Sequence, residues 1–105
     1  MMDKELLELA AKAADIQIEW DESLDSWVIP NDEDGWFSVV RWNPLDNSAQ
    51  AFNLAVKLRL DVNIRGIATI VPYKDLQPIK HGENPYEATR RAIVETAAEI
   101  GKDMK

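Results

Sequence analysis

The chain has 105 residues, of which 46% are hydrophobic and 30% are charged, a balance typical of one soluble globular domain. The absence of cysteine excludes disulfides, thiolate metal sites and a cysteine nucleophile. Nineteen acidic and twelve basic residues give a net charge of −7. No apolar stretch is long enough to span a bilayer, and the first residues lack the apolar core of a signal peptide. We therefore expect a cytoplasmic protein with a single domain over residues 1–105.

The first predicted element is a helix near residues 4–14, where leucine and alanine recur at helical spacing. Two acidic residues, Asp3 and Glu5, lie in its first turn and complement the helix dipole. From Ile16 to Trp20 apolar and polar residues alternate instead, which indicates a half-buried strand.

A hairpin is predicted after this strand. Ser26–Ile29 is a short β-prone run that ends at Pro30, and Asn31–Gly35 has the composition of a turn. Trp36–Trp42 is rich in aromatic and β-branched residues, so we expect it to be the longest strand and to pair with the preceding run.

A second helix is predicted near residues 47–59, because Asp46, Asn47 or Ser48 can cap its start. Apolar residues occupy more than one of its faces, so we expect burial on more than one side. The β-prone segment Val62–Val71 then forms either two short strands that turn at Arg65-Gly66 or one bent strand.

The last helix is predicted near residues 85–100, after a connection at Pro72–Glu83. Asn84 is a good N-cap, Pro85 suits the first helical position, and Gly101 can end the regular part. Helical and strand-like segments thus alternate along the chain. This order predicts an α+β fold, a single-domain helix–sheet–helix (α/β/α) sandwich with a mainly antiparallel sheet and about three helices.

Three segments together resemble the phage ABA sandwich domain family. They are Glu5–Ala14, Trp42–Leu45 followed by Ala55–Leu58, and Tyr86–Val94 followed by Ala97–Gly101. The members of this family are small proteins encoded by tailed bacteriophages and prophages of enteric bacteria. The resemblance implies a helix–sheet–helix sandwich and a phage or prophage origin, and it implies no activity because the family has no assigned function. Two loops are shorter here than in the family, the one after Leu45 and the one in the middle hairpin.

No set of residues points to catalysis, so we predict no enzyme, no catalytic residue, no metal and no cofactor. The carboxylates at Asp32–Asp34 do not fit a calcium loop, because the alignment puts Pro30 first and Arg41 twelfth. His81 is the only histidine and has no second ligand or serine partner in the pattern, so we expect an exposed loop residue. The four glycines are isolated, which excludes a glycine-rich phosphate loop.

The charge is unevenly distributed along the chain. Residues 1–50 carry a net charge of −9 and residues 51–105 a net charge of +2. The segment Asp15–Asp34 holds eight acids and no base. It is either a solvated acidic edge or a surface for a basic partner, which would be another protein or the basic half of a second copy in a homodimer. A negative field of this size opposes direct binding of nucleic acid.

Four tryptophans fall within 23 residues, and two of them flank the acidic turn. Large aromatic side chains are typical of a small core, and exposed tryptophan is enriched at binding hot spots, so both roles stay open. The predicted partner-binding residues are Trp27, Asp32, Glu33, Asp34 and Trp36.

The sequence favours a small non-catalytic phage or prophage accessory protein that binds a host or phage protein. One alternative is an acidic DNA-mimic inhibitor of a host nucleic-acid-binding enzyme. Another is a small ligand-binding protein or enzyme whose pocket the sequence does not reveal. Carboxylates spaced regularly along one face would favour mimicry, an apolar patch would favour a protein partner, and a deep polar pocket would favour the last alternative.

Overall fold

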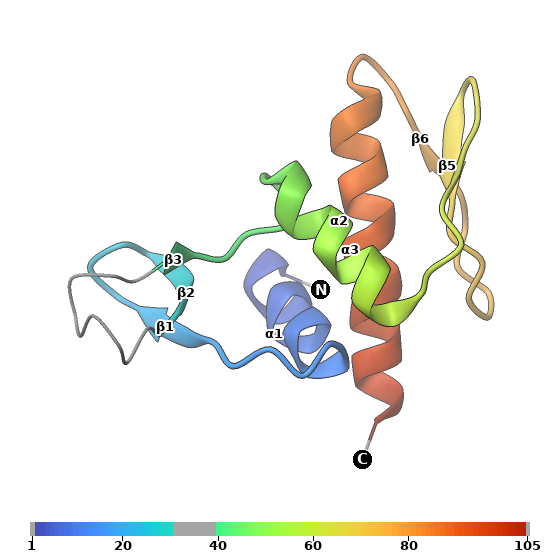
Figure 1. The fold of residues 1–105 in the computed structure, drawn as a ribbon. Helices are drawn as coiled ribbons and strands as arrows, with labels where there is room; N and C mark the ends of the chain where they lie inside the picture. Colours follow the sequence, from blue (N-terminus) through green and yellow to red (C-terminus); the bar gives the residue numbers. More distant parts are fainter. Residues whose placement is uncertain (1, 31–39, 105) are drawn as a thin grey trace.

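The chain folds into three helices that lie between two small antiparallel sheets (Figure 1). The computed structural model describes residues 2–30 and 40–104, and the numbers of helices and sheets refer to that part of the chain. The helices are α1 (Asp3–Ala13), α2 (Ser48–Leu58) and α3 (Pro85–Asp103). Within the described ranges, no helix combines the length and the apolar character that crossing a membrane requires. The α+β class, the three helices and the antiparallel pairing of the strands are confirmed.

Two asparagine side chains start α2 and α3. Oδ1 of Asn47 accepts a hydrogen bond from the N–H of Gln50 at 3.0 Å, which selects Asn47 from the three candidate caps. Oδ1 of Asn84 accepts from the N–H groups of Tyr86 and Glu87 at 3.0 and 3.1 Å. These bonds satisfy backbone donors that the first turn of a helix leaves without a partner. Both helices therefore begin within one residue of the predicted position.

The N-terminal sheet has the order β1–β2–β3. Its strands are β1 (Glu19–Asp21), β2 (Ser26–Ile29) and β3 (Val40–Arg41). The pairing of Val28 with Arg41 confirms that the second and third β-prone runs form a hairpin. The strand expected from Ile16 starts only at Glu19, because the N–H of Ile16 still bonds to the carbonyl of Ala11 at the end of α1. Asn31–Val39, which include the predicted turn, lie outside the described residues.

The second sheet has the order β4–β5–β6. Its strands are β4 (Asn63–Ile64), β5 (Ala68–Ile70) and β6 (Ile79–Lys80). Asn63 pairs with Ile70 and Ile64 with Thr69, so Val62–Val71 forms two strands rather than one bent strand. β6 lies in the segment predicted as a connection, where two paired residues are too few to leave a recognisable alternation.

The order of the layers differs from the predicted helix–sheet–helix sandwich. The strands form one sheet on each side of the helices instead of a single sheet between them (Figure 1). Each strand has only two to four residues, so a sheet of such strands is too small to separate two layers of helices. The helices pack directly on one another because α1 and α3 have small side chains where they meet.

The contact between α1 and α3 forms the centre of the core. Ala10 and Ala11 of α1 and Ala97 of α3 are at most 1% exposed. Gly101 is buried, and a Cβ atom built on it would collide with the carbonyl oxygen of Leu9. Gly101 therefore does not end the helix as expected, since α3 continues to Asp103 and the glycine allows the two backbones to approach closely.

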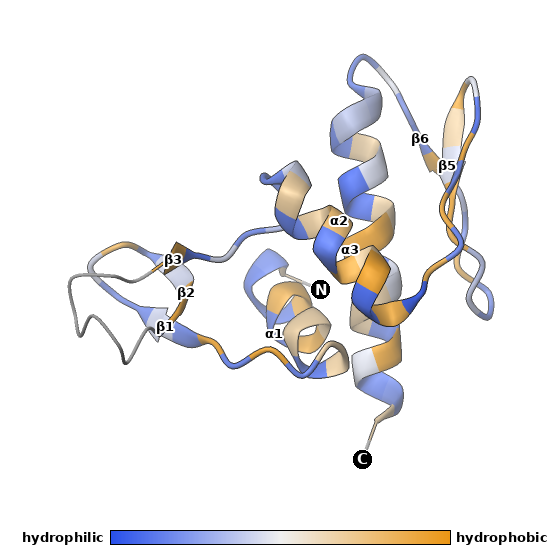
Figure 2. Cartoon of the chain, viewed as in Figure 1, coloured by the Kyte–Doolittle hydropathy of each residue, from blue (hydrophilic) through white to orange (hydrophobic). Residues whose placement is uncertain are grey.

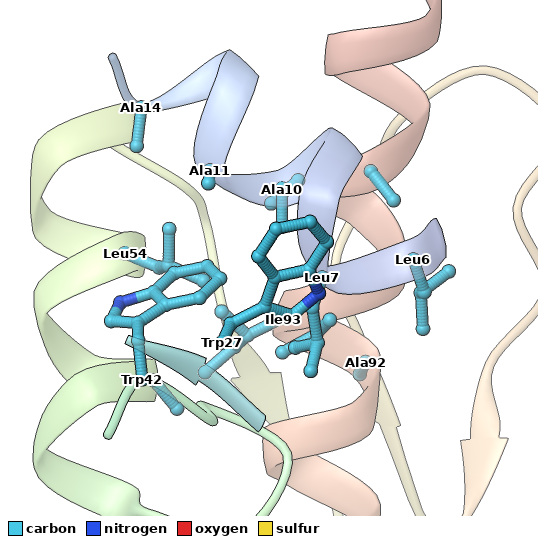
Figure 3. Close-up of a cluster of buried hydrophobic side chains, with 14 of the residues drawn as sticks. Leu6, Leu7, Ala10, Ala11, Ala14, Trp27, Trp42, Leu54, Ala92 and Ile93 are labelled. Atoms are coloured by element: carbon cyan, nitrogen blue, oxygen red, sulfur yellow. The ribbon is translucent and has the colours of Figure 1, made fainter. Parts of the chain in front are cut away.

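Tryptophan side chains join the N-terminal sheet and its flanking segment to this core (Figure 3). Trp27 projects from β2 beside Leu7 and Ala10 of α1, and Trp42 lies next to Leu54 of α2. Trp42 is 2% exposed. The two indole rings thus fill the space that the small alanine side chains leave around α1.

We predict that Gly101→Ala lowers the free energy of unfolding by about 1–3 kcal/mol, because the new methyl group must push α3 away from Leu9. Gly66→Ala is the matched control, since no atom of residues 2–30 or 40–104 beyond its two chain neighbours lies within 4 Å of a Cβ atom at that position. Urea unfolding followed by tryptophan fluorescence measures both. Equal stability of the two variants would contradict the close approach of α1 and α3.

Candidate functional site

An open apolar groove lies between α2 and α3 and continues over the segment that leads from α2 into β4. It has a volume of about 790 Å³. We call it the α2–α3 groove. Its apolar side chains come from α2, from residues 60–64 and from α3, and they are Ala51, Phe52, Ala55, Val56, Leu60, Val62, Ile64, Pro85, Tyr86 and Ile93.

Large apolar side chains at this groove are exposed to solvent. Phe52 is 69% exposed, Val56 56%, Ile64 64% and Tyr86 74%. Figure 2 shows hydrophobic stretches along α2, where they lie close to those of α3. The expectation that α2 is buried on more than one side is therefore wrong for Phe52 and Val56. The described part of the chain covers only the face of α2 that carries Leu54.

Two arginines are the charged residues that line the α2–α3 groove. Arg90 donates from Nε to the carbonyl of Leu45 at 2.9 Å and from Nη1 to Oγ of Ser48 at 3.0 Å, which fixes its guanidinium at the start of α2. Arg59 is the C-cap of α2, with a left-handed backbone at φ 54°. One arginine of the groove lining thus lies at each end of α2, although the protein has a net charge of −7.

Trp27, predicted as a partner contact, belongs to the core, and the prediction is corrected here. Its side chain is 7% exposed, and Nε1 donates a hydrogen bond to the carbonyl of Lys4 at 3.0 Å. Trp20 packs edge-on against it with 5.3 Å between the ring centroids. The pairing of β2 in the middle of its sheet directs Trp27 towards α1, so little of it is left for a partner.

The other predicted site residues are Asp32, Glu33, Asp34 and Trp36. They lie outside the described residues, so the role of the acidic turn as a partner surface stays a prediction. The structure instead brings together a set that sequence reasoning did not select. Helical spacing placed Phe52 and Val56 on one face of α2, but it gave no sign that this face stays open.

His81 is not the free loop residue that the sequence suggested. Its Nε2 lies 2.8 Å from Oγ1 of Thr69, which in turn lies 2.8 Å from Oγ1 of Thr89. Thr69 is fully buried in β5, whereas Thr89 lies on α3 at the α2–α3 groove. Because a fully buried hydroxyl is not presented to a substrate, we assign these three side chains to holding the second sheet on α3. The positions are 12 and 20 residues apart, a spacing with no local signal.

A second polar cluster fastens the loop after β5 to the end of α3. Oδ2 of Asp103 accepts hydrogen bonds from Nζ of Lys74 and from the hydroxyl of Tyr73. These bonds hold the pKa of the Asp103 carboxyl below its usual 3.8, and the bond to Asp103 raises the pKa of Tyr73 and of Lys74. In the β1–β2 turn, hydrogen bonds from Ser23 and Leu24 likewise lower the pKa of Asp21.

Three comparisons with known proteins bear on this site. No family model, no curated protein and no solved structure matches the chain significantly. The resemblance to the phage ABA sandwich domains therefore stays a prediction. Function has to be argued from the geometry and chemistry of the α2–α3 groove.

We predict that Thr69→Val lowers the free energy of unfolding by about 1–3 kcal/mol, because His81 and Thr89 both lose a buried partner. Thr96→Val is the matched control, since the buried hydroxyl of Thr96 donates to the carbonyl of Ala92 in its own helix. Its expected loss is smaller. Chemical denaturation of both variants gives the comparison, and a larger loss for Thr96→Val would refute the assigned role of Thr69.

We also predict an acid-dependent loss of stability that originates at Asp103. A carboxyl whose pKa is lower in the folded than in the unfolded protein stabilises the fold above its unfolded pKa, and this contribution is lost as the pH falls through the folded pKa. Asp103→Asn should remove this part of the acid dependence. Asp75 is a carboxylate in the loop after β5, which Asp103 binds, and Asp75→Asn should leave the acid dependence in place. Urea midpoints measured from pH 6 down to about pH 2.5 test the difference. The cluster plays no such part if the two variants have the same pH profile.

Proposed function

We propose that this protein is a non-catalytic binding protein that holds another protein in the α2–α3 groove. The observation that carries the proposal is the gathering of exposed Phe52, Val56, Ile64 and Tyr86 at one groove. Contiguous exposed apolar surface on a soluble protein is typical of an interaction site, whereas single exposed apolar residues are ordinary.

The openness of the groove favours a protein over a small ligand. Pockets for small molecules bury about 70–90% of the ligand surface, which requires enclosing walls. Here Phe52 and Tyr86, which line the groove, are themselves 69% and 74% exposed, so the groove is open to solvent at these side chains. The lining also offers few polar groups to act on a substrate.

The proposal includes the context that the family resemblance implies. The protein would be a phage or prophage accessory protein in the cytoplasm of the bacterial host, with a host or phage protein as its partner and no direct binding of nucleic acid. The DNA-mimic alternative depends on the carboxylates of Asp15–Asp34, which include the acidic turn outside the described residues. The groove argues for the protein partner.

Affinity capture from the bacterial host, with mass spectrometry of the retained proteins, tests the proposal. Val56→Asp places a carboxylate in the groove at an exposed position, so the fold should persist while the partner is lost. A hot-spot loss of about 2 kcal/mol corresponds to roughly 30-fold weaker binding. Ile67→Asp is the matched control, because Ile67 is 83% exposed and does not line the groove.

The acidic turn is tested in the same experiment with the double variant Asp32→Asn and Asp34→Asn. We expect this variant to retain the partner captured by the wild-type protein but to bind it more slowly at low salt, because charge near an interface mainly affects the rate of association. If the partner is lost from the charge variant and retained by Val56→Asp, the binding surface is the acidic turn and the groove proposal is wrong.

A further inference from the structure

We infer that the partner element that occupies the α2–α3 groove is an amphipathic α-helix, apolar on one face and with a carboxylate near each end of that face. This inference rests on the proposed function and names the class of partner. It follows from the shape of the groove, from the placement of its two arginines and from the charge that a second copy would bring.

The shape of the groove suits a helix. The lining combines the small side chains of Ala51 and Ala55 of α2 and Thr89 of α3 with the larger ones of Phe52 and Tyr86. Helices pack with their axes about 8–10 Å apart, and small residues at the contact permit the closer distances. A helix laid along α2 would cover the exposed faces of Phe52 and Val56 in the way that helix-in-groove complexes bury their anchors.

An extended strand fits this site less well. A strand would have to pair with the outer edge of β4, which is the end strand of its sheet. β4 consists of Asn63 and Ile64, and two residues offer few backbone bonds to a new strand. Most of the exposed apolar surface would also stay uncovered, because Phe52 and Tyr86 come from the helices and not from the sheet edge.

The two arginines define the charge of the occupant. Ser48, which Arg90 contacts, is the first residue of α2, and Arg59 is its C-cap. The 11 residues of α2 rise about 16 Å, so Ser48, which the Arg90 guanidinium contacts, and the backbone of Arg59 lie about three helical turns apart. On a helix that runs alongside, residues 11 positions apart return to nearly the same face. Carboxylates at that spacing, with apolar residues between them, complement both ends of the groove.

A second copy of the chain is a poor occupant of the same groove. In a two-fold dimer the same patch faces itself. An antiparallel arrangement of the two α2 helices would bring Arg59 of one copy near Arg90 of the other, and a parallel one would bring each arginine near its own counterpart. Like charges would meet in both cases, which is unfavourable in a dry interface.

Selection from a displayed library of helical peptides tests the inference. The library keeps a helical 16-residue scaffold and varies one face, with the wild-type protein as the bait and Val56→Asp as the counter-selection. We expect enrichment of peptides that are apolar at the central positions and acidic near both ends. Enrichment of basic or proline-containing peptides, or no enrichment that depends on Val56, would overturn the inference.

Charge exchange then tests the role of Arg59 with the most enriched peptide. Arg59→Asp reverses the charge and Arg59→Asn removes it, and both residues tolerate the left-handed backbone of this position. At low salt we expect about 10-fold weaker binding to Arg59→Asp, a smaller loss for Arg59→Asn, and recovery when the peptide acid nearest Arg59 is changed to lysine. No recovery with lysine at either end of the peptide would contradict the proposed pairing.

Two further measurements separate this inference from the proposed function. If captured host or phage protein depends on Val56 but no helical peptide binds, the helix is wrong and the binding function stands. If Val56→Asp captures the same proteins as the wild type, both are wrong. Sedimentation equilibrium tests whether a second copy of the chain occupies the groove. A wild-type dimer that Val56→Asp dissociates would assign the groove to this second copy and overturn the inference.

Discussion

The close approach of α1 and α3 is the constraint on which the rest of this structure depends. At Gly101 the backbone of α3 lies so near the carbonyl of Leu9 that no side chain fits between them. Buried alanines of both helices belong to the same core cluster, and their small side chains favour a close approach of the two backbones. The bulk that a small domain needs for its core therefore has to come from elsewhere, and the tryptophans of β2 and of the segment after β3 supply it. This explains why Trp27 is a core residue despite its position beside an acidic turn.

In the same arrangement only one of the apolar faces of α2 packs into the core. Ala51 and Leu54 are at most 1% exposed and complete the core, whereas Phe52 and Val56, on the adjacent face, are more than half exposed. Because α2 contributes one face to the core, its second apolar face is available for an interaction. Arg90, which contacts Ser48 at the start of α2, and Arg59, the C-cap of α2, add positive charge there. The groove is thus a consequence of how the core is completed and not a separate addition to the fold.

The second sheet completes the groove, and two polar clusters hold this sheet in place. Ile64 belongs to β4, and β4 is positioned by pairing with β5. Thr69 of β5 is bonded to His81 and to Thr89, and Thr89 itself lines the groove. At the other end of α3, Asp103 binds the loop that follows β5. The shape of the groove is therefore coupled to the hydrogen bonds that fasten the sheet to α3.

The sequence by itself determined the helices, their starting points and the pairing of β2 with β3, because these depend on neighbours along the chain. It left open whether Val62–Val71 forms two strands or one bent strand. The caps at Asn47 and Asn84 are contacts over two or three residues, and the spacing of apolar residues is a local pattern. It could not determine that the strands divide into two sheets, that Gly101 is a contact point rather than a helix end, or that His81 has a buried partner. Each of these depends on residues far apart in the chain. Only the tertiary structure decided that Trp27 is buried and that Phe52 and Val56 are exposed, because the face of an amphipathic element that is covered depends on which other elements pack against it.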